Sequence, residues 1–431
     1  MNREDIQVLI IRFVSKLPIV MQKFVFRSII ETRYLIFRIS CKKVSRKKNM
    51  ADPGRVYWLP TDRIIKCLSP EDRKGIFNSE KLRGKIVGGN WDLVNYEFTN
   101  TIDVYQAFKK RISEKVEWRD TEYYKRIFSQ VESGTFLYGI RNKGDLDERC
   151  KYLDTLFENI KKEGYRLNRF NYNKNITFNE IDVNIGRNGE YIFRDGIHRL
   201  SIAKVLGLKW VPVTVCVRHK KWQEFRDFLF SNSERIVDRK LFQPLIHLDL
   251  ADIPFNKGHY ADEGLWKAMK FHLSKEPGIM LDVGAKIGFW CHKFEDLGYN
   301  CYAVEQDPEL CYVMQKIKVA ENKKFEIINK SIFEVDLIKE MIFDVVLALD
   351  IFHNFLKTKT RYFQLIDLLR NLKTNKLFFE LHNFDEDQME DAYVHYDENE
   401  FLNFLLENST LTKSELIYKT KYGSHIFKLF K

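Results

Sequence analysis

The chain has 431 residues, of which 45% are hydrophobic and 14% aromatic, and its formal net charge is +11. The length exceeds that of an ordinary single domain, and the hydrophobic fraction excludes a disordered chain. Seven cysteines without a CxxC pair indicate neither a disulfide framework nor a metal site, which favours a cytoplasmic protein. Composition and hydrophobic patterning divide the chain into a leader (1–50), a middle domain (51–235), a linker (236–260) and a C-terminal domain (261–431).

The leader is strongly basic, because residues 1–48 hold 12 Lys and Arg against 3 Asp and Glu. Apolar residues are interspersed with cations over residues 5–40, as in an amphipathic helix broken near Pro18. This pattern favours a helical segment that lies on an anionic membrane surface, which would make the protein peripheral at the inner face of the membrane. Packing on the next domain and binding to nucleic acid are the alternatives. The segment is not expected to span a bilayer.

The middle domain contains a strand, a tight turn at Asn188-Gly189, a second strand and then a short helix that closes at Gly207. Between the second strand and this helix stands the sequence Asp195-Gly196-Ile197-His198-Arg199. Gly196 permits close approach of backbone to a ligand, and the N-terminus of a helix presents unpaired amides to an anion. Arg199 adds a guanidinium fork and His198 a further donor.

This order of elements resembles the ParB/sulfiredoxin-like superfamily, with residues 195–199 at the place of its phosphate-binding box. The resemblance implies a small α+β domain that binds ATP or CTP with Mg²⁺ through Gly196, His198 and Arg199. Some members of the superfamily are small-molecule kinases, which makes Asp195 and His198 candidate catalytic residues. Ile197 departs from the kinase box, which has a histidine there. The alternative is that Asp195 and Arg199 form a buried ion pair that holds the turn.

Three further features of the middle domain are candidates for the same site. Asp62 ends the opening strand, at the place where kinase-like relatives carry an acidic residue, and is a candidate general base; its alternative is a helix N-cap. The turn at residues 88–92 would line a pocket or serve only as a turn. Residues 218–221 follow the last strand, at 211–217, and would meet phosphate or solvent.

The C-terminal domain begins its sheet with an apolar strand that runs straight into a glycine-bearing turn and a helix, at Ile279 to Trp290. This is the first unit of a doubly wound α/β fold. The second strand ends in Glu305, 23 residues after Asp282, a spacing that places an acid beside a ribose. A dinucleotide fold would need a glycine at Lys286 for its pyrophosphate, so the pattern favours a different adenosine-containing cofactor.

The segments LDVGAKIGFW (281–290) and AVEQDP (303–308) resemble the first two motifs of class I S-adenosylmethionine-dependent methyltransferases. A hairpin at residues 416–430, around Tyr422-Gly423, is typical of the same family. The resemblance implies a Rossmann-like sheet that binds S-adenosylmethionine at its strand tips. The residues that it assigns to the cofactor are Asp282, Gly284, Gly288, Glu305, Ser331, Ile332 and Asp350.

Ser331 and Ile332 depart from the family, which often has an acid there. The fourth strand, at 343–349, leads into Asp350 and His353, which should face the transferred methyl group. His353 is a candidate general base or a residue that positions the substrate. Glu380 and His382, at the end of the fifth strand, would complete the pocket.

These features together predict a bifunctional enzyme. The middle domain would phosphorylate a small-molecule or glycan acceptor, and the C-terminal domain would methylate the acceptor or the new phosphate, as in the logic of polysaccharide chain terminators. One alternative is a nucleotide- or nucleic-acid-binding module that targets or gates the methyltransferase. Another is an inert scaffold beside an active methyltransferase. The chain lacks the Asn/Asp-Pro-Pro-Tyr motif of enzymes that methylate exocyclic amines, which makes DNA bases a less favoured acceptor.

Overall fold

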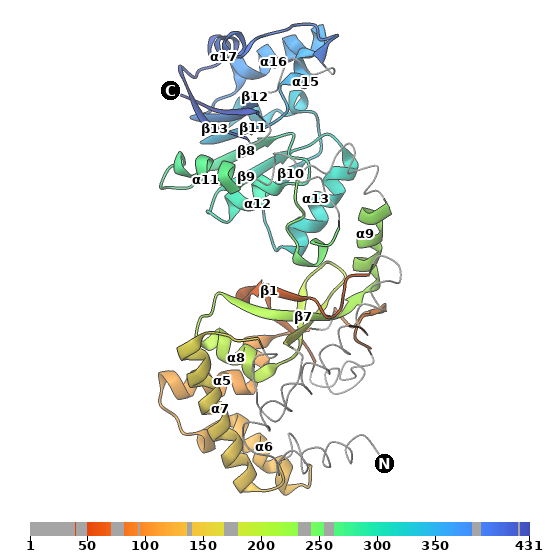
Figure 1. The fold of residues 1–431 in the computed structure, drawn as a ribbon, viewed down its shortest axis with the longest axis vertical. Coiled ribbons are helices and arrows are strands. Elements are labelled where there is room, and N and C mark those ends of the chain that lie inside the picture. The colour runs from red at the N-terminus through yellow and green to blue at the C-terminus, as the bar shows by residue number, and fades with distance from the viewer. Residues whose placement is uncertain are drawn as a thin grey trace, which may run out of the picture. The chain divides into compact units, whose positions relative to one another are not determined.

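The computed structural model describes residues 39, 50–69, 82–93, 95–135, 140–167, 180–231, 243–253, 263–381, 389–420 and 423–431. The chain divides into two compact units, Met1–Asp227 and Phe228–Lys431. Each unit has helices and one sheet with both parallel and antiparallel strands, in agreement with the predicted α/β fold class (Figure 1). The leader lies outside the described residues except for Ile39, so its amphipathic helix stays a prediction. Within the described ranges, no helix is both long and apolar enough to cross a membrane.

The sheet of the first unit has the strand order β1-β7-β5-β6-β2-β4, and β3 also pairs with β7. Because β3 and β5 run parallel to β7, the carboxyl ends of these three strands lie at one edge of the sheet. Strand β6 is antiparallel to β5 and therefore ends at the opposite edge. The strands are β1 (Val56–Pro60), β2 (Lys66–Leu68), β3 (Lys85–Val87), β4 (Asn95–Glu97), β5 (Ile181–Ile185), β6 (Tyr191–Asp195) and β7 (Trp210–His219).

Helix α8, which follows β6, contacts α5 and α7, and α6 packs against both α5 and α7. The predicted turn at Asn188-Gly189 is confirmed, with Gly189 at φ +89°. The helices of this unit include α4 (Phe98–Thr101), α5 (Asp103–Ser113), α6 (Glu122–Glu132), α7 (Lys143–Glu163) and α8 (Ile197–Val205), with 3-10 turns η1 (Thr61–Arg63) and η4 (Trp118–Asp120), and helix α9 (Lys220–Ser231) contains the boundary at Asp227.

The sheet of the second unit has the order β10-β9-β8-β11-β12-β14-β13. Its first five strands are parallel, and β14 is antiparallel to both neighbours, so the predicted closing hairpin is confirmed. The order reverses between β8 and β11, which makes their carboxyl ends the topological switch point. The strands are β8 (Ile279–Val283), β9 (Asn300–Val304), β10 (Glu326–Ile328), β11 (Val345–Ala348), β12 (Lys376–Leu381), β13 (Lys413–Lys419) and β14 (His425–Phe430).

Helices cover both faces of this sheet, with α11 and α12 on one side and α16 and α17 on the other (Figure 1). Neighbouring strand residues alternate between two apolar cores: Val346 packs with α16 and α17, whereas Leu347 packs with α11 and α12. Burial on both faces explains why these strands read as continuous apolar runs. The helices include α11 (Glu263–Phe271), α12 (Phe289–Glu295), α13 (Pro308–Ala320), α14 (Leu337–Glu340), α15 (His353–Leu356), α16 (Lys359–Asn371) and α17 (Glu398–Glu407).

Residues 243–253 correct the expected linker at 236–260. Gln243, His247, Leu250 and Ile253 are all at most 3% exposed, and a short 3-10 helix, η6 (Leu248–Leu250), lies among them. This stretch is a packed part of the second unit, so the unit includes residues before the expected boundary at 261.

Candidate active site

The chain turns sharply where β8 ends. Gly284 has φ +71° and Gly288 has φ +79°, a region of backbone conformation that favours glycine. A Cβ atom on Gly284 would lie 3.1 Å from Cδ1 of Ile351, and one on Gly288 would lie 2.8 Å from Cγ of Met314. Gly284 therefore borders the tip of the neighbouring strand, whereas Gly288 is required by the packing of α12 on α13.

Glu305 follows β9 and is only 7% exposed. Its Oε2 accepts the amide of Lys286 at 3.0 Å, and its Oε1 accepts the amide of Asp307 at 2.8 Å. Burial raises the pKa of Glu305, and these two backbone amides oppose that shift. Each carboxylate oxygen has a second lone pair, so the group still has capacity for two hydroxyl donors.

Four of the predicted cofactor residues line one hollow at the strand tips. They are Gly284, Glu305, Ser331 and Ile332, and Ile351 lies on the same wall. The hollow measures about 60 Å³. Pockets that enclose a small-molecule ligand are typically about 300–1,000 Å³, so this hollow accommodates one part of such a ligand, and the remainder would lie across its mouth.

Asp282 lies beneath the glycine turn and does not line the hollow. It is 3% exposed, and the Cys291 thiol lies 3.9 Å from its Oδ2. Burial, reinforced by the charge of Glu305, raises the pKa of Asp282 to about 7. Asp282, which was predicted to bind the cofactor, is therefore a buried acid outside the lining of this hollow.

Asp350 and His353 lie together just beyond β11. His353 is 7% exposed, and its Nδ1 is 3.5 Å from Oδ1 of Asp350. On the other side of Asp350, Nζ of Lys286 lies 3.6 Å from Oδ2. Lys286 was predicted only to exclude a dinucleotide turn, and its pairing with Asp350 was not predicted.

Two residues that sequence reasoning did not single out, Gln243 and Arg361, make hydrogen bonds at the site. Oε1 of Gln243 accepts the amides of Ile287 (3.2 Å) and Phe289 (3.3 Å), and so holds the turn and the start of α12. Nη1 of Arg361 donates to Oγ of Ser331 at 3.3 Å, beside the hollow.

Glu380, expected at the end of β12, is buried at 6% exposure, and His382 lies outside the described residues.

The predicted phosphate box of the first unit lies at the start of α8. Gly196 is left-handed, with φ +90°, and a Cβ atom there would lie 3.1 Å from Cα of Ile181. The glycine is therefore needed for packing on β5. Asp195 is exposed, and its Oδ1 accepts the Gly196 amide at 2.7 Å. Arg199 lies beside Glu180, at 3.9 Å between Nη1 and Oε2, so the alternative of a buried Asp195–Arg199 pair is wrong.

His198 is surrounded by donors and cations. Its Nδ1 lies 3.4 Å from Nη2 of Arg149, and its Nε2 lies 3.2 Å from the hydroxyl of Tyr123. A guanidinium has no acceptor, so Nδ1 accepts and Nε2 carries the proton. Burial, together with Arg149, Arg199 and Arg126, lowers the pKa of His198 to about 3, and the ring is neutral near pH 7.

Asp62 lies away from the box, contrary to expectation. It is exposed in η1, where the neighbouring Thr61 carbonyl accepts from Nζ of Lys204 at 3.0 Å. Lys204 follows His198 by six residues along α8, a rise of about 9 Å. Asp62 therefore lies toward the opposite end of α8. It is not a helix N-cap either, because Pro60 holds that position.

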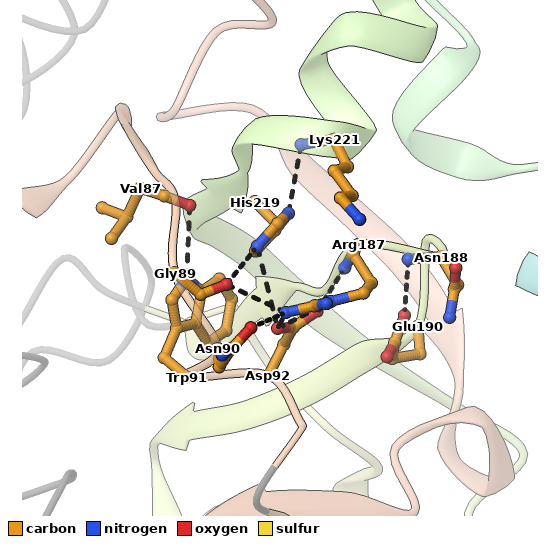
Figure 2. Close-up of polar contacts among 10 residues, drawn as sticks. All are labelled: Val87, Gly89, Asn90, Trp91, Asp92, Arg187, Asn188, Glu190, His219 and Lys221. Carbon is orange, nitrogen blue, oxygen red and sulfur yellow. Dashed lines mark hydrogen bonds and ion pairs between the residues drawn. The ribbon is translucent and has the colours of Figure 1, made fainter.

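A buried polar network joins the carboxyl ends of β3, β5 and β7 (Figure 2). Asp92 is 1% exposed and accepts from Nε and Nη2 of Arg187, both at 2.8 Å. Nδ1 of His219 accepts the amide of Lys221 at 3.0 Å, so its Nε2 carries the proton and donates to the Gly89 carbonyl at 3.0 Å. Although burial alone would raise the pKa of Asp92, the hydrogen bonds of Arg187 hold it below the ordinary value.

The turn at residues 88–92 is held by hydrogen bonds to Arg187 and His219. Of the residues expected to follow the last strand, Arg218 and His219 instead belong to β7 and are each 2% exposed, whereas Lys220 and Lys221, at the start of α9, are exposed to solvent.

No protein-family model and no curated protein sequence matches this chain. Similar solved structures include two of WbdD, one described as a bifunctional kinase-methyltransferase, at 17% and 18% identity and a TM-score of 0.36. They align over 46% of this chain and over 48% and 45% of their own chains, less than half their length. A magnesium protoporphyrin IX methyltransferase from Synechocystis with bound SAM has 14% identity and a TM-score of 0.30, over 39% of this chain and 76% of its own.

Proposed function

We propose that the second unit is an S-adenosylmethionine-dependent methyltransferase. The observation that carries this proposal is the buried carboxylate of Glu305, which two backbone amides fix beside the Gly284 turn at the switch point of a doubly wound sheet. The two remaining lone-pair directions of this carboxylate match the two hydroxyl groups of a ribose. The residues present thus fit the ribose part of the cofactor, and the hollow fits a part of the ligand rather than the whole.

In this proposal each residue has a separate task. Glu305 accepts the ribose hydroxyls, Gly284 keeps the mouth of the hollow open, and Ser331 with Arg361 borders the adenine. When bound, the cofactor supplies an activated methyl group. His353, oriented by Asp350, positions the acceptor and accepts its proton. Transfer to an oxygen nucleophile then depends mainly on proximity and orientation.

Calorimetric titration of the full chain with S-adenosylhomocysteine, the stable product of methyl transfer, tests this proposal. We expect saturable binding at one site per chain. An absence of measurable heat and of any thermal stabilisation at millimolar ligand would overturn it, because a ligand that binds only the folded state must raise the unfolding temperature.

We further propose that the first unit binds ATP or CTP with Mg²⁺ and phosphorylates an acceptor that the second unit then methylates. Support comes from the positive charge of Arg149 and Arg199 beside a neutral His198 at the start of α8. The acceptor hydroxyl would attack the terminal phosphorus, the nucleoside diphosphate would leave, and the exposed carboxylate of Asp195 would take the hydroxyl proton. Asp62 has no part in this step, because it lies toward the other end of α8.

Incubation with γ-labelled ATP and candidate glycan ends or small hydroxyl compounds tests the kinase reaction. We expect label transfer that is lost in Arg199→Gln and kept in Arg166→Gln, because Arg166 is exposed and pairs with the nearby Glu163. Nucleotide binding without transfer would favour the alternative of a nucleotide-gated module. Salt-sensitive retention on DNA or RNA would favour a nucleic-acid-binding module instead.

A glycan acceptor that is linked to a membrane would require the protein to work at the membrane surface. We propose that the basic leader, residues 1–48, holds the protein on an anionic membrane, which would bring it to membrane-linked glycans. Co-sedimentation with vesicles that contain phosphatidylserine, compared with purely zwitterionic vesicles, tests this. Equal retention on the two vesicle types, or retention that persists without residues 1–48, would contradict it.

A further inference from the structure

The two most exposed large hydrophobic side chains of the described residues lie at one edge of the second sheet. Phe271 is 84% exposed and Ile342 is 60% exposed. Phe271 ends helix α11, eight residues before β8, and Ile342 stands three residues before β11. Because β8 and β11 are parallel, both residues precede the same edge, where these strands begin, which we call the amino edge. The hollow beside Glu305 lies at the opposite edge.

Hydrogen bonds hold the neighbours of both side chains against the start of β12. Nζ of Lys376, the first residue of β12, donates to the carbonyl of His272 at 2.9 Å. The amide of Phe343 donates to the carbonyl of Lys373, also at 2.9 Å. His272 and Phe343 directly follow the two exposed residues in the chain. The backbone that carries the exposed side chains is therefore anchored to the same part of the sheet.

Positive charge predominates around the two apolar side chains. The segments that lead into β8, β11 and β12 are residues 270–276, 339–344 and 373–376. They hold five lysines and three acidic residues, an excess of 5 − 3 = +2. One of the three acids, Asp344, accepts hydrogen bonds from the Ile279 amide and from the Asn375 side chain.

Lys428 of β14 brings another cation to this edge. Its Nζ lies 3.1 Å from Nδ1 of His272, and it also pairs with Glu415. Burial and the charge of Lys428 lower the pKa of both His272 and Lys376. Both shifts disfavour further positive charge here, so a negatively charged surface would be the electrostatic complement of the amino edge.

Exposed apolar side chains within a surround of lysines suit the boundary of an anionic bilayer. The apolar groups enter the edge of the acyl region, and lysines extend their amino groups to the lipid phosphates. Hydrophobic side chains that are exposed singly carry no such meaning, but here the two most exposed ones share an edge with the excess of cations. Protein interfaces are depleted in lysine, which favours a lipid surface over a protein partner.

We propose that the amino edge of the second unit docks on an anionic lipid membrane, with Phe271 and Ile342 entering the headgroup boundary. This contact is separate from the leader and does not depend on the proposed methyltransferase function. It also sets an orientation. Strand β8 has five residues and spans about 17 Å, so the hollow at its other end would face away from the lipid. The acceptor would then extend from the membrane rather than lie in its plane.

Co-sedimentation of the full chain with vesicles of equal parts phosphatidylcholine and phosphatidylserine tests this proposal. We expect Phe271→Ser to weaken binding by about five- to ten-fold, because a large apolar side chain no longer leaves water. Ile342→Ser should weaken it further when both are combined. The control is Phe363→Ser on α16, which removes a side chain that is 54% exposed away from the amino edge and should leave binding unchanged.

A tryptophan at the same position reports contact with lipid directly. In Phe271→Trp, vesicles with brominated acyl chains should quench the fluorescence more than in the unaltered chain, whose own tryptophans supply the background. Phe363→Trp is the matched control and should show no added quenching. Equal quenching in the two variants would contradict the proposal.

Two further results would overturn it. If the double variant of Phe271 and Ile342 binds the vesicles as tightly as the unaltered chain, any membrane contact belongs to the leader alone. If the double variant instead loses self-association in analytical ultracentrifugation while vesicle binding stays the same, the amino edge contacts a second copy of the chain. Neither result would bear on the methyltransferase proposal, which is tested by cofactor binding.

Discussion

The backbone amide of Lys286 and the carboxylate of Glu305, 3.0 Å apart, join the glycine turn after β8 to the tip of β9. The two strands are parallel neighbours, with Val283 opposite Val304, so the residue that follows each strand must lie at the same edge of the sheet. The acid is thereby held against the turn before any ligand arrives. A group that is fixed in advance loses little conformational entropy on binding.

Glu305→Gln tests the ribose contact. The substitution keeps the shape but removes the charge and replaces one acceptor oxygen with a donor. We expect binding of both S-adenosylhomocysteine and 5′-methylthioadenosine to weaken by about 10- to 100-fold in calorimetry, because both ligands carry the same ribose. Glu326→Gln, at an exposed site on β10, is the control and should change neither. Full affinity for methylthioadenosine in Glu305→Gln would show that the carboxylate does not contact the ribose.

Asp282→Asn tests the pKa of the buried acid. The folded-state pKa of about 7 lies above the ordinary value of 3.8, so the folded protein binds more protons than the unfolded chain between these two values. The free energy of unfolding should therefore fall, by a few kcal/mol at most, as the pH rises from about 4 to 7. In Asp282→Asn this slope should be shallower in urea unfolding followed by tryptophan fluorescence. Identical slopes in the two proteins would contradict the assignment.

Gly288→Ala and Gly423→Ala form a matched pair. Both glycines have a positive φ, +79° and +94°, which should cost about 1 kcal/mol in either variant. Only the Cβ atom at residue 288 meets a neighbour, Cγ of Met314 at 2.8 Å, whereas nothing lies within 4 Å at residue 423. We expect Gly288→Ala to lower the free energy of unfolding by about 1–3 kcal/mol more, as overpacking does. Equal losses in thermal and urea unfolding would mean that α12 and α13 adjust freely.

Asp92→Ala tests the buried network of the first unit. Removal of one partner leaves the Arg187 guanidinium, which is 15% exposed, without its carboxylate. A loss of about 3–5 kcal/mol in unfolding free energy is expected for a broken buried pair. The control is Glu122→Ala. The side chains of Glu122 and its partner Lys125 are 77% and 57% exposed, so this ion pair should contribute at most about 1 kcal/mol to the free energy of unfolding. A loss in Asp92→Ala no larger than in the control would show that the network does not stabilise the unit.

The strands of the second unit were predictable because each is a short apolar run covered on both faces. Glu305 was predictable because it is the first polar residue after such a run. The candidate site of the first unit was less predictable, because sequence order does not tell which end of α8 faces the opening strand. Asp62 lies toward the C-terminal end of α8, whereas residues 195–199 lie at its N-terminal end. Strand β7 extends past the predicted end at residue 217 because its pairing with β3 continues through Arg218 and His219, a contact between residues far apart in the chain.

Residues that support the glycine turn were beyond prediction for a related reason. Gln243 stands in an irregular segment with no periodic pattern, and its contact with Ile287 and Phe289 exists only in the folded chain. Arg361 is one of many cations on helical surfaces, and only its position beside Ser331 distinguishes it.

The two hydrogen bonds that the Gln243 side chain accepts from backbone amides limit where this chain can be divided or recombined. A second unit cut at Ala261 would lose the side chain that holds the turn, and the amides of Ile287 and Phe289 would lose that acceptor inside the protein. Any transfer of the second unit to another protein, in the laboratory or by gene fusion, must therefore carry residues 243–253 with it.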